Sequence, residues 1–238
     1  MSFKNKRVWL PVVLSASVAV LSACGGSDDD EEAAVSLWVA NDQGDERGVI
    51  RKYLFTQDDG PGMAEQTIRL GLAEGIAMDA GGHVYQNGIL ANGAGAVRMA
   101  CAPGMRGASV NLTAGTDRNV TTALGSPKGS ALAQQAGYIL VAETGSDDPA
   151  VSLFSTTATN AMAAFTVPRA RVGDSGAWDV AYDEASDKLF IALTNGTVAY
   201  YANFLERLMD GDDLPTALFS ADNRPGCQQH ARHCVHGG

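Results

Sequence analysis

Five side chains of the types that bind metals or form disulfides are gathered at the end of the chain. The segment GCQQHARHCVHGG, residues 226–238, contains Cys227, His230, His233, Cys234 and His236. Cysteine and histidine are common ligands of zinc and copper, but this spacing matches none of the usual paired-ligand layouts. A disulfide between Cys227 and Cys234 is a second interpretation, and it would close only a small loop.

The other end of the chain is typical of an exported protein. An uncharged, mostly apolar stretch of 16 residues, 8–23, follows a basic start made of Lys4, Lys6 and Arg7. A helix needs roughly 20 apolar residues to span a bilayer, so this stretch is short for a membrane span and has the layout of a secretory signal.

The signal-like stretch ends in Leu-Ser-Ala-Cys, residues 21–24, which resembles the lipobox of bacterial lipoproteins. The resemblance implies that residues 1–23 are a signal peptide, that Cys24 is the lipid attachment site, and that the protein is anchored in the bacterial cell envelope. In that class an aspartate after the cysteine favours the inner membrane. Gly25 stands there, so we expect the outer membrane.

Residues 24–34 form a predicted acidic, flexible tether, because five like charges follow Gly25-Gly26-Ser27 and cannot bury a core. Without residues 1–23 the chain has 14 Lys and Arg against 27 Asp and Glu, a net charge of −13. Nucleic acid is therefore excluded as an expected partner, because its binding depends on basic side chains that neutralise phosphates.

A repeat of about fifty residues runs through the rest of the chain. Four alternating segments, SLWVAND, GHVYQNG, GYILVAET and DKLFIALT, predict strands, and counting from Leu37, Val84, Tyr138 and Leu189 the intervals are 47, 54 and 51 residues. A further strand is predicted before each of the last three segments, and another after each of the four. Glycine-containing turns between them are typical of antiparallel hairpins.

Short strands repeated at this period are the signature of β-propeller blades. The spacing and the GIAMDAGGHVY unit resemble the NHL-repeat and gluconolactonase-type propellers. We therefore predict an all-β fold, a partial β-propeller over residues 35–225 with about four blades. A two-sheet β-sandwich is the alternative. Trp38, Trp178, Tyr85, Tyr138 and Phe190 are predicted to pack between blades.

The next inner strand of the repeat is expected close to residue 230, where the Cys/His segment stands instead. Back-translation of residues 226–237 in a frame shifted by one base permits a blade opening there. We therefore expect residues 226–238 to be a disordered or frameshifted tail and the propeller to be incomplete, which would leave blade edges open and promote association.

The resemblance also bears on chemistry. Gluconolactonase-type enzymes hold a divalent metal with a Glu, an Asn and an Asp, the Glu just before a Gly on an inner strand, and Glu74-Gly75 resembles that one element. No counterparts of the Asn and Asp can be assigned, and Lys128 and Gly176 stand at the equivalent places of other blades, so no catalytic residue and no cofactor is predicted. A divalent metal at Glu74 or at the tail is kept as an alternative.

The predicted function is a lipoprotein whose propeller binds a protein, peptide or glycan without catalysis. A metal-dependent lactonase or hydrolase is the alternative. The predicted partners are the membrane, through Cys24, and that unidentified ligand.

Overall fold

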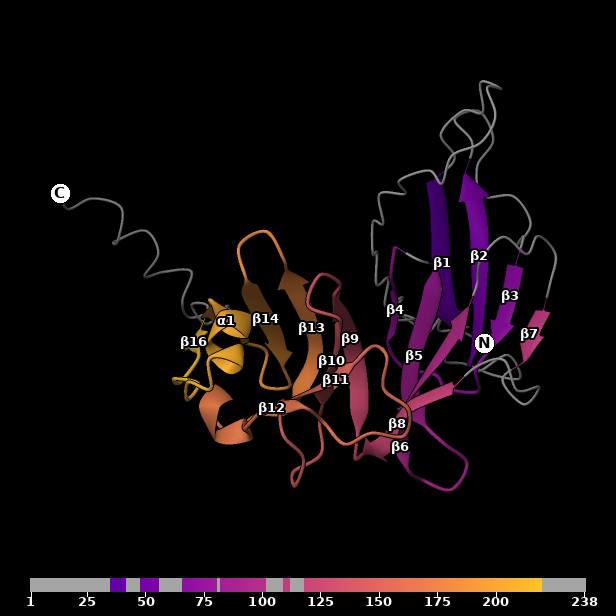
Figure 1. Ribbon diagram of the computed structural model, residues 1–238. Coiled ribbons are helices and arrows are strands. Elements are labelled where there is room, and N and C mark those ends of the chain that lie inside the picture. Colours follow the sequence, from indigo (N-terminus) through magenta and orange to yellow (C-terminus); the bar gives the residue numbers. More distant parts are fainter. Residues whose placement is uncertain are drawn as a thin grey trace, which may run out of the picture.

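The computed structural model describes residues 35–41, 48–55, 66–80, 82–101, 109–111 and 118–219. They form an all-β, propeller-like fold of four four-stranded sheets, which follow one another in a row that does not close into a ring (Figure 1). The only helices in this part of the chain are α1, Phe204–Met209, and a 3-10 turn, Arg169–Val172. Neither is long or apolar enough to cross a membrane.

We number the sheets in chain order. Sheet 1 has the order β1-β2-β3-β7, and sheet 2 has the order β4-β5-β6-β8. Neighbouring strands are antiparallel, except that β7 runs parallel to β3. The strands of sheet 1 are β1 Val35–Asn41, β2 Val49–Phe55, β3 Gln66–Arg69 and β7 Ser109–Asn111. Those of sheet 2 are β4 Ile76–Met78, β5 His83–Ile89, β6 Gly95–Cys101 and β8 Arg118–Leu124.

Sheets 3 and 4 are built from consecutive antiparallel strands, as expected for propeller blades. Sheet 3 consists of β9 Pro127–Ala133, β10 Tyr138–Glu143, β11 Val151–Ser155 and β12 Phe165–Val167. Sheet 4 consists of β13 Ala177–Asp183, β14 Lys188–Leu193, β15 Val198–Ala202 and β16 Leu218–Phe219.

The predicted repeat is confirmed strand by strand. Its four aligned segments are β1, β5, β10 and β14, and the strands predicted before the last three are β4, β9 and β13. Within the described residues, sheet 1 has no strand on the inner side of β1, which agrees with the missing first segment of its repeat. The repeat did not predict β7, which lies between β6 and β8 in the chain but joins sheet 1.

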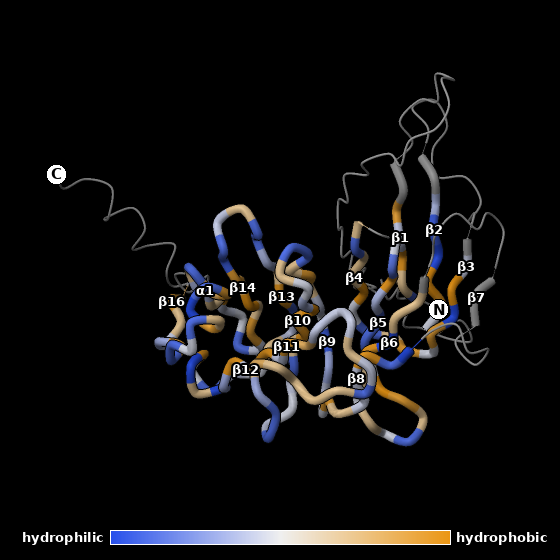
Figure 2. Tube along the Cα trace, in the orientation of Figure 1, coloured by the Kyte–Doolittle hydropathy of each residue, from blue (hydrophilic) through white to orange (hydrophobic). Residues whose placement is uncertain are grey.

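An apolar cluster lies between each pair of neighbouring sheets. The seam between sheets 1 and 2 contains Ile50, Ile68 and Val84, and the seam between sheets 2 and 3 is built around Tyr85 and Phe154. The seam between sheets 3 and 4 is the largest of the three clusters. Strands supply most of the hydrophobic trace, whereas the turns are mostly hydrophilic (Figure 2). Alternating side chains therefore let an inner sheet pack on two neighbours at once.

Two details differ from the expected packing of aromatic residues. Ile139, and not Tyr138, matches Val84 and Leu189, because each of these three faces the preceding sheet. Trp178 lies on the inner strand β13 and is 53% exposed, so it does not fill a seam.

Candidate functional site

The inner strands of sheets 2, 3 and 4 crowd together where they begin. A Cβ added to Gly75, just before β4, would lie 2.6 Å from the carbonyl oxygen of Lys128 on β9. A Cβ on Gly129 would lie 1.7 Å from Oδ1 of Asp179 on β13. Both distances are below van der Waals contact, so glycine is required for the backbones to approach this closely. The approach sets the spacing of the side chains around it.

Three of those side chains form a charged and aromatic cluster, which we call the inner-strand site. Lys128 Nζ donates to Glu74 Oε1 at 2.8 Å, and both side chains are partly buried. The same ammonium group lies 5.3 Å from the ring centre of Trp178. A cation over an indole face is attracted by the negative face of the ring, and the carboxylate balances its charge. The three side chains come from three different sheets.

Polar groups lie next to the inner-strand site, and one of them, Asn87, is buried. Burial raises the pKa of the Asp179 carboxyl, and one of its oxygens accepts a hydrogen bond from the Val180 amide. Asn87 donates from Nδ2 to the carbonyl oxygen of Lys128 at 2.5 Å. Asn87 Oδ1 and Ser130 Oγ are buried without a hydrogen-bond partner. Buried polar atoms of this kind are satisfied in most proteins by ordered water or a bound group.

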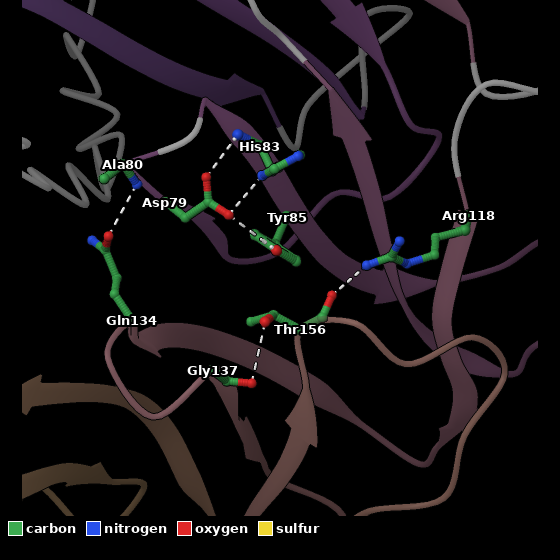
Figure 3. Close-up of polar contacts among 8 residues, drawn as sticks. All are labelled: Asp79, Ala80, His83, Tyr85, Arg118, Gln134, Gly137 and Thr156. Atoms are coloured by element: carbon green, nitrogen blue, oxygen red, sulfur yellow. Dashed lines mark hydrogen bonds and ion pairs between the residues drawn. The ribbon is translucent and has the colours of Figure 1, made fainter. Parts of the chain in front are cut away.

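The opposite end of the same strands carries a second polar cluster, shown in Figure 3. Asp79 Oδ2 lies 2.8 Å from His83 Nδ1 and accepts a hydrogen bond from the Tyr85 hydroxyl at 3.2 Å, and Asp79 Oδ1 accepts the His83 amide. Burial, followed by the nearby Asp79 carboxylate, raises the pKa of Tyr85 to about 12. A phenol with that pKa stays protonated at neutral pH and acts as a hydrogen-bond donor.

Contacts across the seam tie this second cluster to sheet 3. The Ala80 amide donates to Gln134 Oε1 at 2.9 Å, and Arg118 donates to the carbonyl oxygen of Thr156 (Figure 3). Thr156 Oγ1 donates in turn to the carbonyl oxygen of Gly137. These hydrogen bonds lie within the protein and join two blades.

A further carboxyl, that of Glu143, has a structural explanation. Glu143 is almost completely buried, and burial raises its pKa, but Ser152 Oγ donates to it at 2.5 Å and the Gly125 amide at 3.0 Å. These hydrogen bonds use both of its oxygens and join β10 to β11 and to the turn before β9.

Only one of the predicted site residues, Glu74, lies in the described part of the chain. Glu74 lies in the inner-strand site, paired with Lys128, so a divalent ion at Glu74 would have to displace an ammonium group. No group of three or more His, Cys, Asp or Glu side chains is placed to hold a metal ion among the residues that the structure describes. Cys24 and all five candidates of the tail, Cys227, His230, His233, Cys234 and His236, lie outside those residues, and their roles stay predictions.

Sequence reasoning missed most of the inner-strand site. Lys128 occupies the place in the repeat that corresponds to Glu74, and this equivalence is the one signal that pointed to their meeting. Trp178 was expected to pack in a seam. Asn87 and Ser130 carry no motif, because their meeting depends on how two sheets approach each other.

Comparison with known proteins shows no family for this chain. No family model matches the chain, and no curated protein matches it. Eighteen chains of solved structures match, among them one described as the crystal structure of a nidogen/laminin complex. The match covers 71% of this chain at 18% identity and a TM-score of 0.40. This chain spans 61% of that chain, which is less than two thirds of its length.

Proposed function

We propose that this protein is a lipoprotein of the bacterial cell envelope whose propeller-like domain binds a basic segment of a partner protein at the inner-strand site. The observation that carries the proposal is the half-exposed ring of Trp178, which already holds one ammonium group between itself and the Glu74 carboxylate. A site that binds an internal lysine in this way suits a lysine or arginine of a partner.

The charge of the chain supports a cationic ligand. Without residues 1–23 it has a net charge of −13. A field of this sign attracts basic partners over a distance and raises the rate of their association.

The anchoring part of the proposal rests on the Leu-Ser-Ala-Cys motif. Lipid on Cys24 and a tether over residues 24–34 would hold the domain a short distance from the outer membrane. Replacement of Cys24 by Ser is expected to abolish lipid incorporation and release the protein from the membrane fraction. Incorporation that persists in this variant would contradict the anchor.

Binding is tested with the chain from residue 24 onward, carrying Cys24→Ser, and a fluorescent decalysine peptide followed by anisotropy. Deca-glutamate and a chitin oligosaccharide serve as comparison ligands. Trp178→Ala is expected to weaken decalysine binding about 10-fold. Met162→Ala, which removes a side chain that is 76% exposed and away from the site, is the matched control and should change nothing.

Lys128→Met separates a specific site from general attraction by an acidic protein. It frees Glu74 and Trp178, so a specific site should bind decalysine more tightly, whereas Glu74→Gln should weaken binding. Equal affinity for all variants would refute the site. If the oligosaccharide binds in a Trp178-dependent way and decalysine does not bind, the ligand of the site is a glycan and not a basic segment. Metal-dependent lactone hydrolysis abolished by Glu74→Ala would favour the enzyme.

A further inference from the structure

The second strand of sheets 2, 3 and 4 places a bulky side chain toward the following sheet at the same position. Tyr85, Leu140 and Phe190 each pair with an alanine of the inner strand, namely Ala77, Ala131 and Ala181. Tyr85 is 2% exposed in the seam between sheets 2 and 3, and Leu140 is buried between sheets 3 and 4. Phe190 is therefore the seam residue of sheet 4 for a sheet that would follow it.

The face of sheet 4 around Phe190 is an apolar row without a covering sheet in the described part of the chain. Register places Ala181, Phe190, Tyr200 and Leu218 side by side across all four strands. The rings of Phe190 and Tyr200 stack with their centres 6.1 Å apart. Phe190 is 38% exposed, and Leu218 is more exposed still. Apolar rows of this length are rare on the surface of a monomer and mark interaction surfaces.

Sheet 1 has the complementary open face. Trp38 packs toward sheet 2, so its neighbours Leu37 and Val39 lie on the outer face, opposite Tyr53 and Arg51 of β2. In the other sheets the residues that match Leu37 are Val84, Ile139 and Leu189, and each is buried against the preceding sheet. Val39 is 42% exposed. Sheet 1 therefore presents the kind of face that receives a preceding sheet.

The charges of the two end sheets are opposite. The strands β1, β2 and β3 contain Arg51, Lys52 and Arg69 and no acidic residue, and Lys52 lies over Trp38 on the face toward sheet 2. The strands β13, β14, β15 and β16 contain Asp179 and Asp183 against Lys188. Opposite charges favour the contact of sheet 1 with sheet 4, whereas contact of sheet 4 with its own copy would bring acidic segments together.

We propose that the outer face of sheet 4 packs against the outer face of sheet 1 of a second copy of this chain, and that the same contact on the other side closes a ring of eight sheets. Eight is within the range of blades that propellers use, and a head-to-tail contact that closes after two copies gives a discrete dimer rather than a fibre. The occupant of each open face is then the matching face of the partner copy.

The test is the mass of the chain from residue 24 onward, carrying Cys24→Ser, measured by sedimentation velocity at micromolar concentrations. The expected result is a dimer. Phe190→Asp alters sheet 4, Val39→Asp alters sheet 1, and each should raise the dissociation constant at least about 30-fold, as for central interface residues. Met162→Asp, at an exposed position away from both faces, should leave the dimer intact. Circular dichroism and a cooperative melt confirm that each variant is folded.

Mixing the two monomeric variants distinguishes the head-to-tail contact from a symmetric one. The Phe190→Asp chain keeps an intact sheet 1 and the Val39→Asp chain keeps an intact sheet 4, so the mixture should regain a dimer held by one contact. A monomeric parent protein would overturn the proposal and leave both faces to other blades or other proteins. A dimer that survives Val39→Asp would overturn it in favour of sheet 4 packing on itself.

Discussion

Two polar clusters lie at the two ends of the inner strands β4 and β9. The aromatic residue of one cluster is buried, and that of the other is half exposed. At one end Tyr85 is buried in the seam, and its hydroxyl is held by Asp79. At the other end Trp178 is half exposed and interacts with a lysine from a neighbouring blade. Each cluster contains an aromatic ring and a carboxylate, yet one joins blades and the other faces solvent.

The difference teaches how to separate structural from binding residues in a repeat fold. A buried ring contributes several kcal/mol to stability, because its apolar surface leaves water on folding. A half-exposed ring contributes less to stability and keeps its face for another molecule. Substitutions at the Tyr85 end should therefore lower stability, and substitutions at the Trp178 end should lower binding.

Replacement of the two rings by alanine tests this contrast most strongly. Tyr85→Ala should lower the free energy of unfolding by about 4 kcal/mol, the usual cost of removing a buried aromatic side chain. Trp178→Ala should lower it by about 1 kcal/mol or less. Urea denaturation of both variants measures the difference, and equal losses would show that Trp178 is as much a packing residue as Tyr85.

Glycine substitutions compare the two ends at the level of the backbone. Gly75→Ala should cost about 3 kcal/mol, because its Cβ would meet the backbone of Lys128 and Ser130. Gly137→Ala, in the turn after β9, should cost only about 1 kcal/mol, because it has a φ of +70° but room for a methyl group. Urea denaturation of the two glycine variants shows which substitution lowers the free energy of unfolding more. A reversed order would contradict the close approach of β4 and β9.

The raised pKa of the Tyr85 hydroxyl should make the stability of the protein depend on pH in the alkaline range. Its pKa of about 12 lies above the ordinary 10.0, so between pH 10 and 12 the folded state binds more protons and stability falls as pH rises. The fall should be about 2 kcal/mol from this group. Tyr201, whose pKa is also raised to about 12 by burial, adds a similar slope. Burial and the hydrogen bond to Asp187 also raise the pKa of Tyr182, so Tyr85→Phe should remove roughly a third of the slope; an unchanged slope would refute the assignment.

The ion pair of the inner-strand site should have the smallest effect on stability. Glu74→Gln is expected to cost about 0.5–1 kcal/mol, because the pair is partly exposed. Asp79→Asn, at the other end, should cost about 2 kcal/mol, since Asp79 accepts three hydrogen bonds. Thermal melts of both variants check the ranking. A larger loss of stability for Glu74→Gln than for Asp79→Asn would show that the Glu74–Lys128 pair mainly stabilises the fold.

Strand prediction succeeded where the signal is local. Alternation of apolar and polar residues and glycine at turns lie within a few residues of each other, so β5, β10 and β14 and the strands before them were predicted at their observed places. The three-residue strand β7 was not predicted, because its pairing with β3 joins residues about forty apart and has no local pattern. The one-residue difference between Tyr138 and Ile139 arose because a repeat alignment does not see which face is buried.

Part of the candidate site could also be predicted from the sequence. The corresponding places of Glu74 and Lys128 in two repeats were visible, but their ion pair was not, because it crosses from sheet 2 to sheet 3. The exposure of Trp178 follows from its position at the start of β13, beside Gly129 and the crowded backbones of the inner strands. That proximity is a property of packed sheets.

The sequence by itself determined the places of the repeated strands, the fifty-residue repeat and the acidic charge of this protein. Each of these depends on neighbouring residues or on composition. Only the tertiary structure decided that Tyr85 is buried while Trp178 is exposed, and that no sheet of the described part of the chain covers the outer faces of sheets 1 and 4. The physical reason is that alternation tells which residues share a face of a strand, whereas burial of that face depends on a sheet contributed by a distant part of the chain.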